Sequence, residues 1–238
     1  MRAFLTLLIL LWSGVVTAQS PSAPLTANER ALIDATQRND VEAAQRLIAA
    51  GTSVNAQDEK RDSAFLLAGA AGRLEILKLA LQAGADLKST NRYGGTALIP
   101  AAHYGHVEVV RVLLATTIDI DHVNRLGWTA LLEAIILGDG GAAHTEVVGL
   151  LLKAGARVDL ADGQGVTPLA HARQRGQSAI VRLLEDAGAP VDLVLGPDEI
   201  AAATDPYRVL WIMPNQWQTE RPLYDGRVRF VGDPIGVV

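Results

Sequence analysis

Two series of residues recur along this chain at the same interval. A serine or threonine that follows each polar loop forms the first series, at Ser63, Thr96, Thr129 and Thr167, with spacings of 33, 33 and 38 residues. The second series follows each outer apolar stretch, at Gly51, Gly84, Thr117, Gly155 and Gly188, with spacings of 33, 33, 38 and 33 residues. Both series place five extra residues in the same interval. Such a constant period indicates a repeat architecture, in which each unit becomes stable by stacking on its neighbours.

Residues 91–127 (NRYGGTALIPAAHYGHVEVVRVLLATTIDIDHVNRLG) show one unit in full. Thr96 is placed to cap a helix, because its hydroxyl can accept a hydrogen bond from an amide two or three residues later. The alanines at 101–102 let neighbouring units approach closely. Gly105 ends this helix, and His106 opens a second one with apolar residues at helical spacing. Each unit is therefore predicted to be two helices followed by a polar loop.

The stretches that carry this pattern resemble the ankyrin repeat, which has a period near 33 and the signature T-P-L-H-x-A. They are GGTALIPAAHYGHVEVVRVLL, GWTALLEAI, HTEVVGLLLKAGARVDLAD, GVTPLAHARQRGQSAIVRLLEDAGA and LEILKLALQAGADL. The resemblance implies an all-α repeat solenoid of five stacked units over residues 28–190, bounded as 28–58, 59–91, 92–124, 125–162 and 163–190. It also implies that loop tips and inner helices form a concave surface for binding.

The chain departs from this signature in two ways. Its proline is present only at Pro168. The histidine position is held by apolar residues, namely Leu66, Ile99, Leu132 and Ala170. The first unit is more polar than the others and lacks the Gly-x-Thr motif, as the end of a stack requires.

Composition excludes several functional classes. The chain has no cysteine, which rules out disulfides, thiolate zinc sites and a cysteine nucleophile. The net charge of −5, with both signs interspersed, argues against a dedicated nucleic-acid binder, which would carry a basic stripe. With 49% hydrophobic residues, the chain can bury a substantial core.

The N-terminus has the features of an export signal. Arg2 is followed by the apolar run 3–11, and small residues at 16–18 predict cleavage after Ala18. Residues 19–27 would then form an extended leader. The alternative is a retained membrane anchor, although the apolar run is shorter than the roughly 20 residues that span a bilayer. Export without cysteines favours the periplasm, or secretion.

No pattern of catalytic or metal-binding residues emerges. His103 and His106 are three residues apart, but His106 is explained as a turn residue of the repeat. Glu133 is the one carboxylate on an apolar inner helix, and no acid or base partner for it is evident from the sequence. We expect it to bond to the backbone of the insertion at 138–143, or to face the binding surface. The chain is therefore predicted to be no enzyme and to use no metal or small-molecule cofactor.

Partner binding is assigned to side chains at the loop tips and inner-helix ends that packing does not require. Arginine, tyrosine and tryptophan are enriched at interface hot spots. The candidate binding residues are Arg92, Tyr93, His103, Tyr104, Arg125, Leu126, Trp128 and Gln164. The alternative is that these side chains pack between adjacent tips. The insertion at 138–143 is either neutral loop variation or a protrusion beside the groove.

Residues 191–238 differ in character from the repeats. YRVLWIM and GRVRFVG are predicted to be two short strands, so this extension is either a two-stranded cap on the last repeat or a docking segment.

The leading functional hypothesis is a non-catalytic, exported module that binds a protein partner. By resemblance, its role would be to support a periplasmic enzyme such as catalase, or to neutralise a toxin. The alternatives are a membrane-tethered scaffold, or an enzyme with its site where the extension meets the last repeats.

Overall fold

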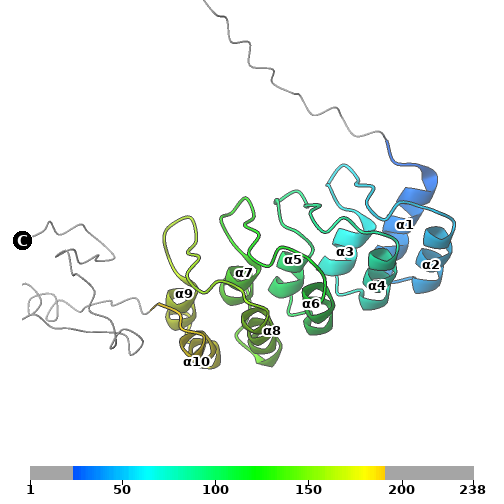
Figure 1. Cartoon of the computed structure of the whole chain (residues 1–238). Helices are drawn as coiled ribbons and strands as arrows, with labels where there is room; N and C mark the ends of the chain where they lie inside the picture. Colours follow the sequence, from blue (N-terminus) through cyan, green and yellow to red (C-terminus); the bar gives the residue numbers. More distant parts are fainter. Residues whose placement is uncertain (1–23, 191–238) are drawn as a thin grey trace, which may run out of the picture.

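The computed structural model describes residues 24–190, and this part of the chain consists of α-helices and loops without a β-strand. The helices are α1 (Ala27–Arg38), α2 (Val41–Ala49), α3 (Ala64–Ala70), α4 (Leu74–Gln82), α5 (Leu98–His103), α6 (Val107–Leu114), α7 (Ala130–Ile136), α8 (Ala142–Lys153), α9 (Pro168–Gln174) and α10 (Ser178–Asp186). They form two rows, with the odd-numbered helices in one row, the even-numbered helices in the other, and the long loops projecting on one side (Figure 1). This confirms the predicted all-helical solenoid. The predicted signal segment and the predicted strands lie outside the described residues.

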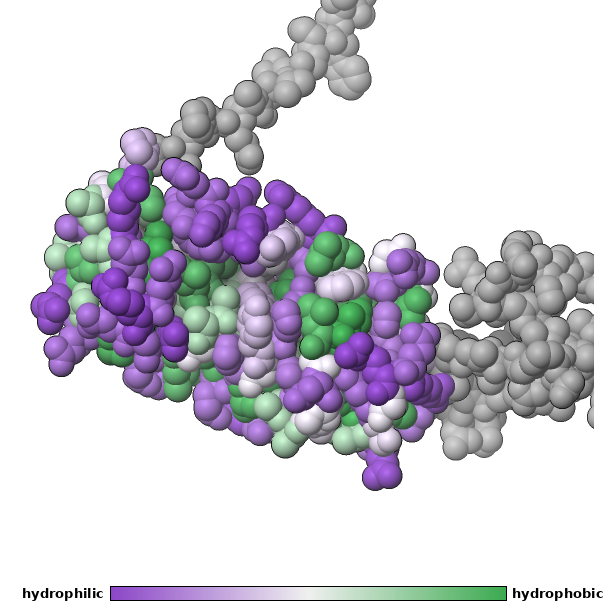
Figure 2. Space-filling view, turned by 180° about the vertical axis from the view of Figure 1, so that it is seen from behind, coloured by the Kyte–Doolittle hydropathy of each residue, from purple (hydrophilic) through white to green (hydrophobic). Residues whose placement is uncertain are grey.

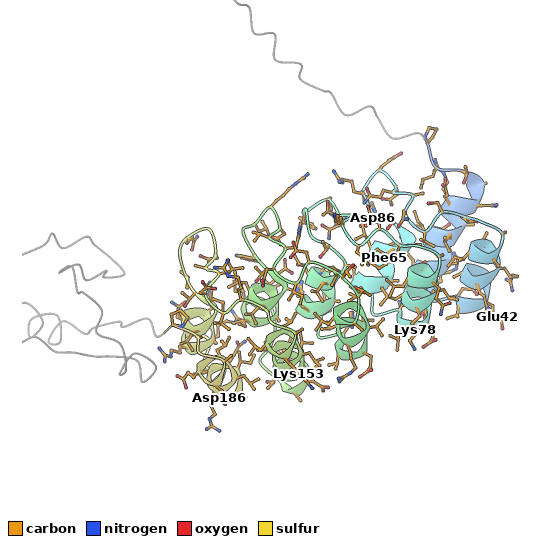
Figure 3. The ribbon with its side chains drawn as sticks, in the orientation of Figure 1. Glu42, Phe65, Lys78, Asp86, Lys153 and Asp186 are labelled. Carbon is orange, nitrogen blue, oxygen red and sulfur yellow. The ribbon has the colours of Figure 1, made fainter. Side chains whose placement is uncertain are left out.

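Stacking in both rows builds one continuous core. Each odd-numbered helix packs on the next odd-numbered helix, and the same holds for the even-numbered row. The largest apolar residue of each inner helix after the first occupies the same position, and all four are at most 1% exposed: Phe65, Leu98, Leu131 and Leu169. Figure 3 shows Phe65 inside the stack, whereas Glu42, Lys78 and Lys153 lie on the outer row. Gly69 marks a close approach, because a Cβ added there would lie 2.9 Å from Ala97.

Polar side chains also connect each pair of helices to the pair before it. In each pair after the first, a side chain just before the outer helix or in its first turn donates a hydrogen bond. The acceptor is a carbonyl near the end of the inner helix of the previous pair. His106 Nε2 lies 3.1 Å from the carbonyl oxygen of Ala70, and His144 Nε2 lies 2.8 Å from that of His103. Arg73 and Gln177 make the equivalent bonds to Gln37 and Ile135. A carbonyl can only accept, so both histidines donate hydrogen bonds that hold adjacent helix pairs together.

Helix capping follows the predicted series at three of its four positions. The side-chain oxygens of Ser63, Thr129 and Thr167 each accept a bond of 3.2 Å from the amide three residues later. The prediction that Thr96 caps α5 is wrong, because its hydroxyl is buried without a partner. Pro100 has no amide to donate to the Thr96 carbonyl, so the Ile99 amide bonds to that carbonyl instead, at 3.3 Å. The first turn is thereby displaced, and α5 has only six residues.

The glycine series has one exception, which a neighbouring threonine explains. Thr117 occupies the position that glycines with positive φ hold elsewhere, such as Gly84 at φ 82°. Thr117 is not among the residues with positive φ within 24–190. Instead, the Thr116 hydroxyl donates to the Leu113 carbonyl at 2.6 Å and accepts from the Ile118 amide at 3.2 Å. These two bonds end α6 without a left-handed residue.

The insertion forms a folded loop between α7 and α8 of the fourth helix pair, and this loop also contacts the fifth pair. It adds a turn to the start of α8, which has 12 residues against 8 or 9 in the other outer helices. The Asp139 carboxylate accepts from the Gly141 amide at 2.8 Å and lies 2.7 Å from His144 Nδ1. These two contacts hold the pKa of Asp139 below its ordinary value. Arg175 Nη2, from the last pair, donates to the Gly138 carbonyl at 3.3 Å.

The last helix pair carries its own polar end. Arg173 of α9 occupies the position of Ala102 and Ile135 in the preceding inner helices, and both of those residues are fully buried. Glu185 of α10 occupies the position of a leucine, as at Leu152. The two replacements pair with each other, with Arg173 Nη2 lying 2.8 Å from Glu185 Oε1. The last helix pair therefore carries an ion pair at the positions where the earlier helix pairs have apolar side chains that pack on the next pair.

Replacement of Pro100 by alanine is expected to stabilise the protein. The new amide can donate to the Thr96 carbonyl and restore the first turn of α5, which is worth about 1 kcal/mol in unfolding free energy. Chemical denaturation followed by circular dichroism measures this gain. The control is Pro168→Ala, because Pro168 lies at the start of α9 where no amide is required. Equal effects of the two substitutions would contradict the explanation.

Deletion of residues 191–238 is expected to leave the melting temperature of the array within about 2 °C of the full chain, since Arg173 and Glu185 already close its end. Thermal unfolding of the two chains, followed at 222 nm, provides the comparison. A large drop in melting temperature would show that the extension acts as the cap.

Candidate functional site

The loop tips are held in one repeated conformation. They comprise residues 58–62, 91–95, 124–128 and 162–166. In the third tip, Asn124 Oδ1 accepts from the amides of Leu126 at 2.9 Å and Trp128 at 3.0 Å. Asp58, Asn91 and Asp162 make the same two bonds in their own tips. The side chains between these anchor points are thus presented on a rigid support, which reduces the ordering cost of binding.

Five large apolar residues are exposed in the described part of the chain, and four of them occupy two repeated positions on the third and fourth helix pairs; the fifth, Val123, directly precedes the third tip. Tyr93 and Leu126 are 52% and 53% exposed at the same position of adjacent tips. Tyr104 and Leu137 are 59% and 43% exposed, each one residue after the end of its inner helix. We call these four residues the apolar frame. Figure 2 shows hydrophobic surface gathered below the loops in the C-terminal half of the array, within largely hydrophilic surroundings.

The same positions on the flanking pairs do not extend the frame. At the tips, Lys60 precedes Tyr93 by one repeat, and Gln164 follows Leu126 by one repeat. At the helix ends, Ala71 and Arg175 are the equivalents of Tyr104 and Leu137. The frame is therefore limited to two pairs.

A buried carboxyl group lies at the floor between the two sides of the frame. Glu133 Oε1 accepts from Asn124 Nδ2 at 2.8 Å, and Glu133 Oε2 lies 3.5 Å from His103 Nδ1. The His103 ring stacks on Tyr104 at 4.2 Å between centroids. The expectation that Glu133 bonds to the insertion or is exposed is wrong, because it is 7% exposed and its partner comes from the adjacent tip.

Burial sets the protonation of this pair. Burial raises the pKa of Glu133, opposed by the hydrogen bond from Asn124. Burial and the nearby His144 lower the pKa of His103. The two shifts favour the neutral form of each group, so we treat their 3.5 Å contact as a weak polar contact and not as an ion pair. The sequence analysis missed this contact, although the 33-residue register aligns Pro100 with Glu133 and places His103 one turn further along α5.

The predicted arginines lie at the tips beside the frame. The Arg92 guanidinium lies 4.7 Å from the Tyr93 ring centroid and 3.6 Å from Asp62. Arg125 Nη1 donates to the Arg92 carbonyl at 3.0 Å. The alternative of tip–tip packing is thus realised in part, because Arg125 bridges two tips while its side chain remains exposed.

The two remaining candidate binding residues, Trp128 and Gln164, differ in their exposure. Trp128 is half-buried, and its amide is one of the two that bond to Asn124. Gln164 is exposed at the last tip, outside the frame. Tyr93, Tyr104 and Leu126 therefore lie on the two adjacent pairs that carry the frame, whereas Gln164 lies on the next pair.

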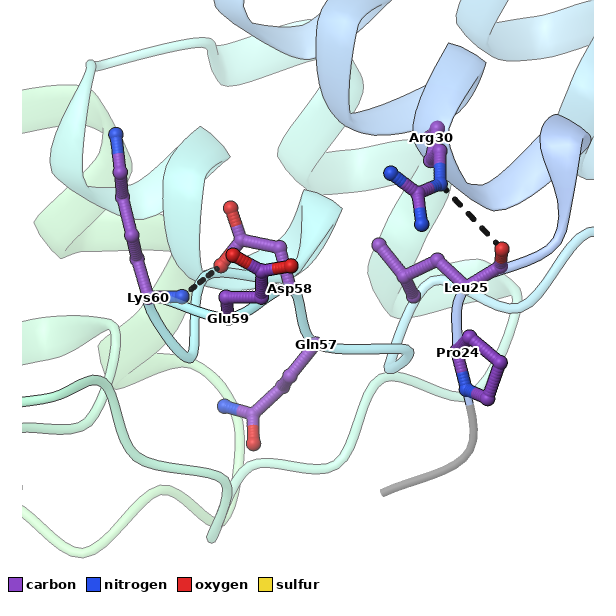
Figure 4. Close-up of a pocket in the computed structure, with 7 residues that line it drawn as sticks. All are labelled: Pro24, Leu25, Arg30, Gln57, Asp58, Glu59 and Lys60. Carbon is purple, nitrogen blue, oxygen red and sulfur yellow. Dashed lines mark hydrogen bonds between the residues drawn. The ribbon is translucent and has the colours of Figure 1, made fainter. Parts of the chain in front are cut away.

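A pocket of about 410 Å³ lies away from the frame, between the N-terminal leader and the first tip (Figure 4). It is lined by Pro24, Leu25, Arg30, Gln57, Asp58, Glu59 and Lys60. Arg30 Nε donates to the Leu25 carbonyl at 3.4 Å within this pocket. Its walls mix both charges and contain no nucleophile with a positioned base. Across residues 24–190 there is no cluster of three metal-ligating side chains, and no helix there is long and apolar enough to cross a membrane.

Known proteins share this architecture. The family model described as "Ankyrin repeats (3 copies)" matches residues 32–124 and 117–194. The crystal structure of an ankyrin repeat domain from Acinetobacter baumannii AYE is 60% identical, with a TM-score of 0.66 over 67% of this chain and 81% of that one. The ankyrin repeat protein EF0377 is 42% identical, with a TM-score of 0.63 over 65% of this chain and 78% of that one.

A curated relative matches over a shorter stretch. YahD of Escherichia coli (strain K12), a protein named for ankyrin repeats, is 51% identical over 57 residues. The match spans 24% of this chain and 28% of YahD.

Replacement of Glu133 by glutamine is expected to stabilise the protein at pH 7. Since the folded-state pKa of Glu133 is raised, its contribution to stability falls as pH rises from the unfolded-state pKa through the folded-state pKa. Glutamine keeps the oxygen that accepts from Asn124 and removes the buried charge. The melting temperature of Glu133→Gln should exceed that of the wild type at pH 7, and the difference should vanish below the ordinary glutamate value of 4.5.

The control for this prediction is Glu59→Gln, which removes an exposed carboxylate from the first tip. It should change the melting temperature little at either pH. A gain for Glu133→Gln that is equally large at pH 4 and pH 7 would contradict the assignment of the effect to charge burial.

Proposed function

Because the chain belongs to the ankyrin-repeat family, a general protein–protein interaction fold, we propose that it is a non-catalytic module that binds a protein partner through the apolar frame. The observation that carries the proposal is the confinement of Tyr93, Tyr104, Leu126 and Leu137 to two adjacent helix pairs. Packing does not account for these side chains, since about half of each is exposed. Contiguous exposed apolar surface with a polar border is typical of interaction sites.

The chemistry of the frame fits an interface centre. Tyrosine offers a large contact area together with a polar group, and it is enriched at binding hot spots. The stacking of His103 on Tyr104 and the cation–π contact of Arg92 with Tyr93 limit the side-chain freedom that binding would otherwise remove. Glu133 and His103 support the floor, and we assign them no catalytic role because no nucleophile lies beside them in the described residues.

We further propose that the protein is exported to the periplasm, on the basis of the signal features of residues 1–18. There, support of an enzyme such as catalase and neutralisation of a toxin are the two roles that the resemblance suggests. N-terminal sequencing of the exported protein tests the location. A mature start at Gln19 supports it, whereas a start at Met1 would favour a membrane-tethered scaffold.

Loss of the frame should abolish partner capture without unfolding the array. The double variant Tyr93→Ala/Tyr104→Ala is expected to lower partner affinity by at least tenfold, because removal of hot-spot tyrosines commonly costs about 2 kcal/mol. Affinity capture from a periplasmic extract, followed by titration of the recovered partner, measures the effect.

The matched control is Lys60→Ala/Gln164→Ala, which alters the same tip position on the flanking pairs. It should leave affinity unchanged. Circular dichroism confirms folding of both variants. If the control weakens binding as much as the frame variant does, the binding surface lies elsewhere on the array.

A further inference from the structure

We infer that the frame recognises a protein segment in which carboxylate side chains stand next to apolar ones. This inference rests on the proposed function and specifies the chemistry of the partner. It follows from the charged groups that surround the frame, from their bonding, and from the contrast with the rest of the array.

Exposed arginines lie beside the frame, and the exposed acid that follows Leu137, Asp139, is already bonded to the Gly141 amide and to His144. Arg125 precedes Leu126 at the tip, and Arg175 holds the position that follows Leu137 by one repeat. Their guanidinium groups bond to the backbone oxygens of Arg92 and Gly138, and neither forms an ion pair with a carboxylate within residues 24–190. Each group keeps further N–H donors for a partner, because a guanidinium has five.

Arg92 adds a third cation that is only loosely paired. Its Nη1 lies 3.6 Å from Asp62, beyond hydrogen-bonding distance, and its side chain is 49% exposed. The contact with the Tyr93 ring fixes the guanidinium beside the frame. Because Arg92 is already positioned, its side chain loses less conformational entropy when it binds a carboxylate.

The acidic group within the frame does not oppose an acidic partner. Glu133 is buried, bonded to Asn124 and shifted toward its neutral form. His103, the titratable group that faces it from α5, is likewise shifted toward its neutral form. Because Glu133 is only 7% exposed, a ligand at the surface of the frame does not contact its carboxyl group directly.

Three arginines elsewhere on the array are paired with acids on their own surface, whereas Arg182 has no such partner in the described residues. Arg111 lies 2.7 Å from Glu146, Arg157 lies 2.8 Å from Asp159, and Arg173 lies 2.8 Å from Glu185. The chain as a whole carries a net charge of −5. The net negative charge of the chain repels an acidic segment, whereas the arginines beside the frame attract it. This contrast directs an acidic segment to the frame.

The test is selection of a random 12-residue peptide library against the exported chain. We expect the selected peptides to be enriched in aspartate and glutamate next to leucine, isoleucine, phenylalanine or tyrosine. A synthetic peptide from the selection should bind about tenfold more weakly to Arg125→Glu, and its affinity should fall with salt. A peptide with lysine in place of the acidic residue should regain affinity for that variant.

Two controls separate local from general effects. Arg182→Glu makes the same charge change on α10, at an exposed arginine for which the described residues provide no partner, and it should leave affinity unchanged. Arg125→Met keeps an apolar stem without the charge and should weaken binding less than Arg125→Glu does. Circular dichroism verifies that each variant is folded.

The outcomes are distinguishable. Peptides that need Tyr93 and Leu126 but are neutral or basic would overturn the inference and leave the proposed function in place. Peptides whose binding is unaffected by Tyr93→Ala and Leu126→Ala would overturn both. A single-stranded thymidine 12-mer that binds the frame more tightly than the peptides would overturn the inference in favour of a nucleic acid.

Discussion

The structure depends on the fact that one helix pair cannot bury its own apolar face. Each pair presents residues such as Leu98 and Val110 to its neighbours, and these residues are fully buried only because another pair lies on each side. The requirement for close approach explains the small residues of the inner row, where Gly69 leaves no space for a Cβ. It also explains the ion pair of Arg173 and Glu185, which replaces apolar contacts on the last pair of the described array.

Stacking at a fixed interval makes every position comparable with its equivalents along the chain, and this comparison separates scaffold from function. Positions that anchor a tip or bond to the preceding pair keep their role even when the residue type changes, as His106 and Gln177 show. Positions free of such roles vary, and two of them carry exposed large apolar side chains on adjacent pairs, namely Tyr93 with Leu126 and Tyr104 with Leu137. The binding proposal follows from this local departure and not from the fold itself.

Several features could be predicted from the sequence because they depend on local residues and on the period. The helices, the caps at Thr129 and Thr167, and the turn role of His106 all follow from spacing and side-chain chemistry. The cap at Thr96 could not be predicted in this way, since Pro100 removes a bond that the pattern assumes. Thr116 likewise supplies a helix end that the missing glycine at 117 had obscured.

The sequence by itself determined the architecture, since a 33-residue period and alternating apolar stretches are compatible with few other folds. It also indicated most of the residues of the proposed binding surface, but not Leu137, whose exposure appears only in the structure. Only the tertiary structure decided how those residues combine. Glu133 and Asn124 belong to the fourth pair and its tip, whereas His103 comes from α5 of the third pair. Burial shifts the pKa of Glu133 and that of His103, which a linear pattern does not report. The apolar frame and its unpaired arginines likewise exist only after stacking has determined which side chains remain exposed.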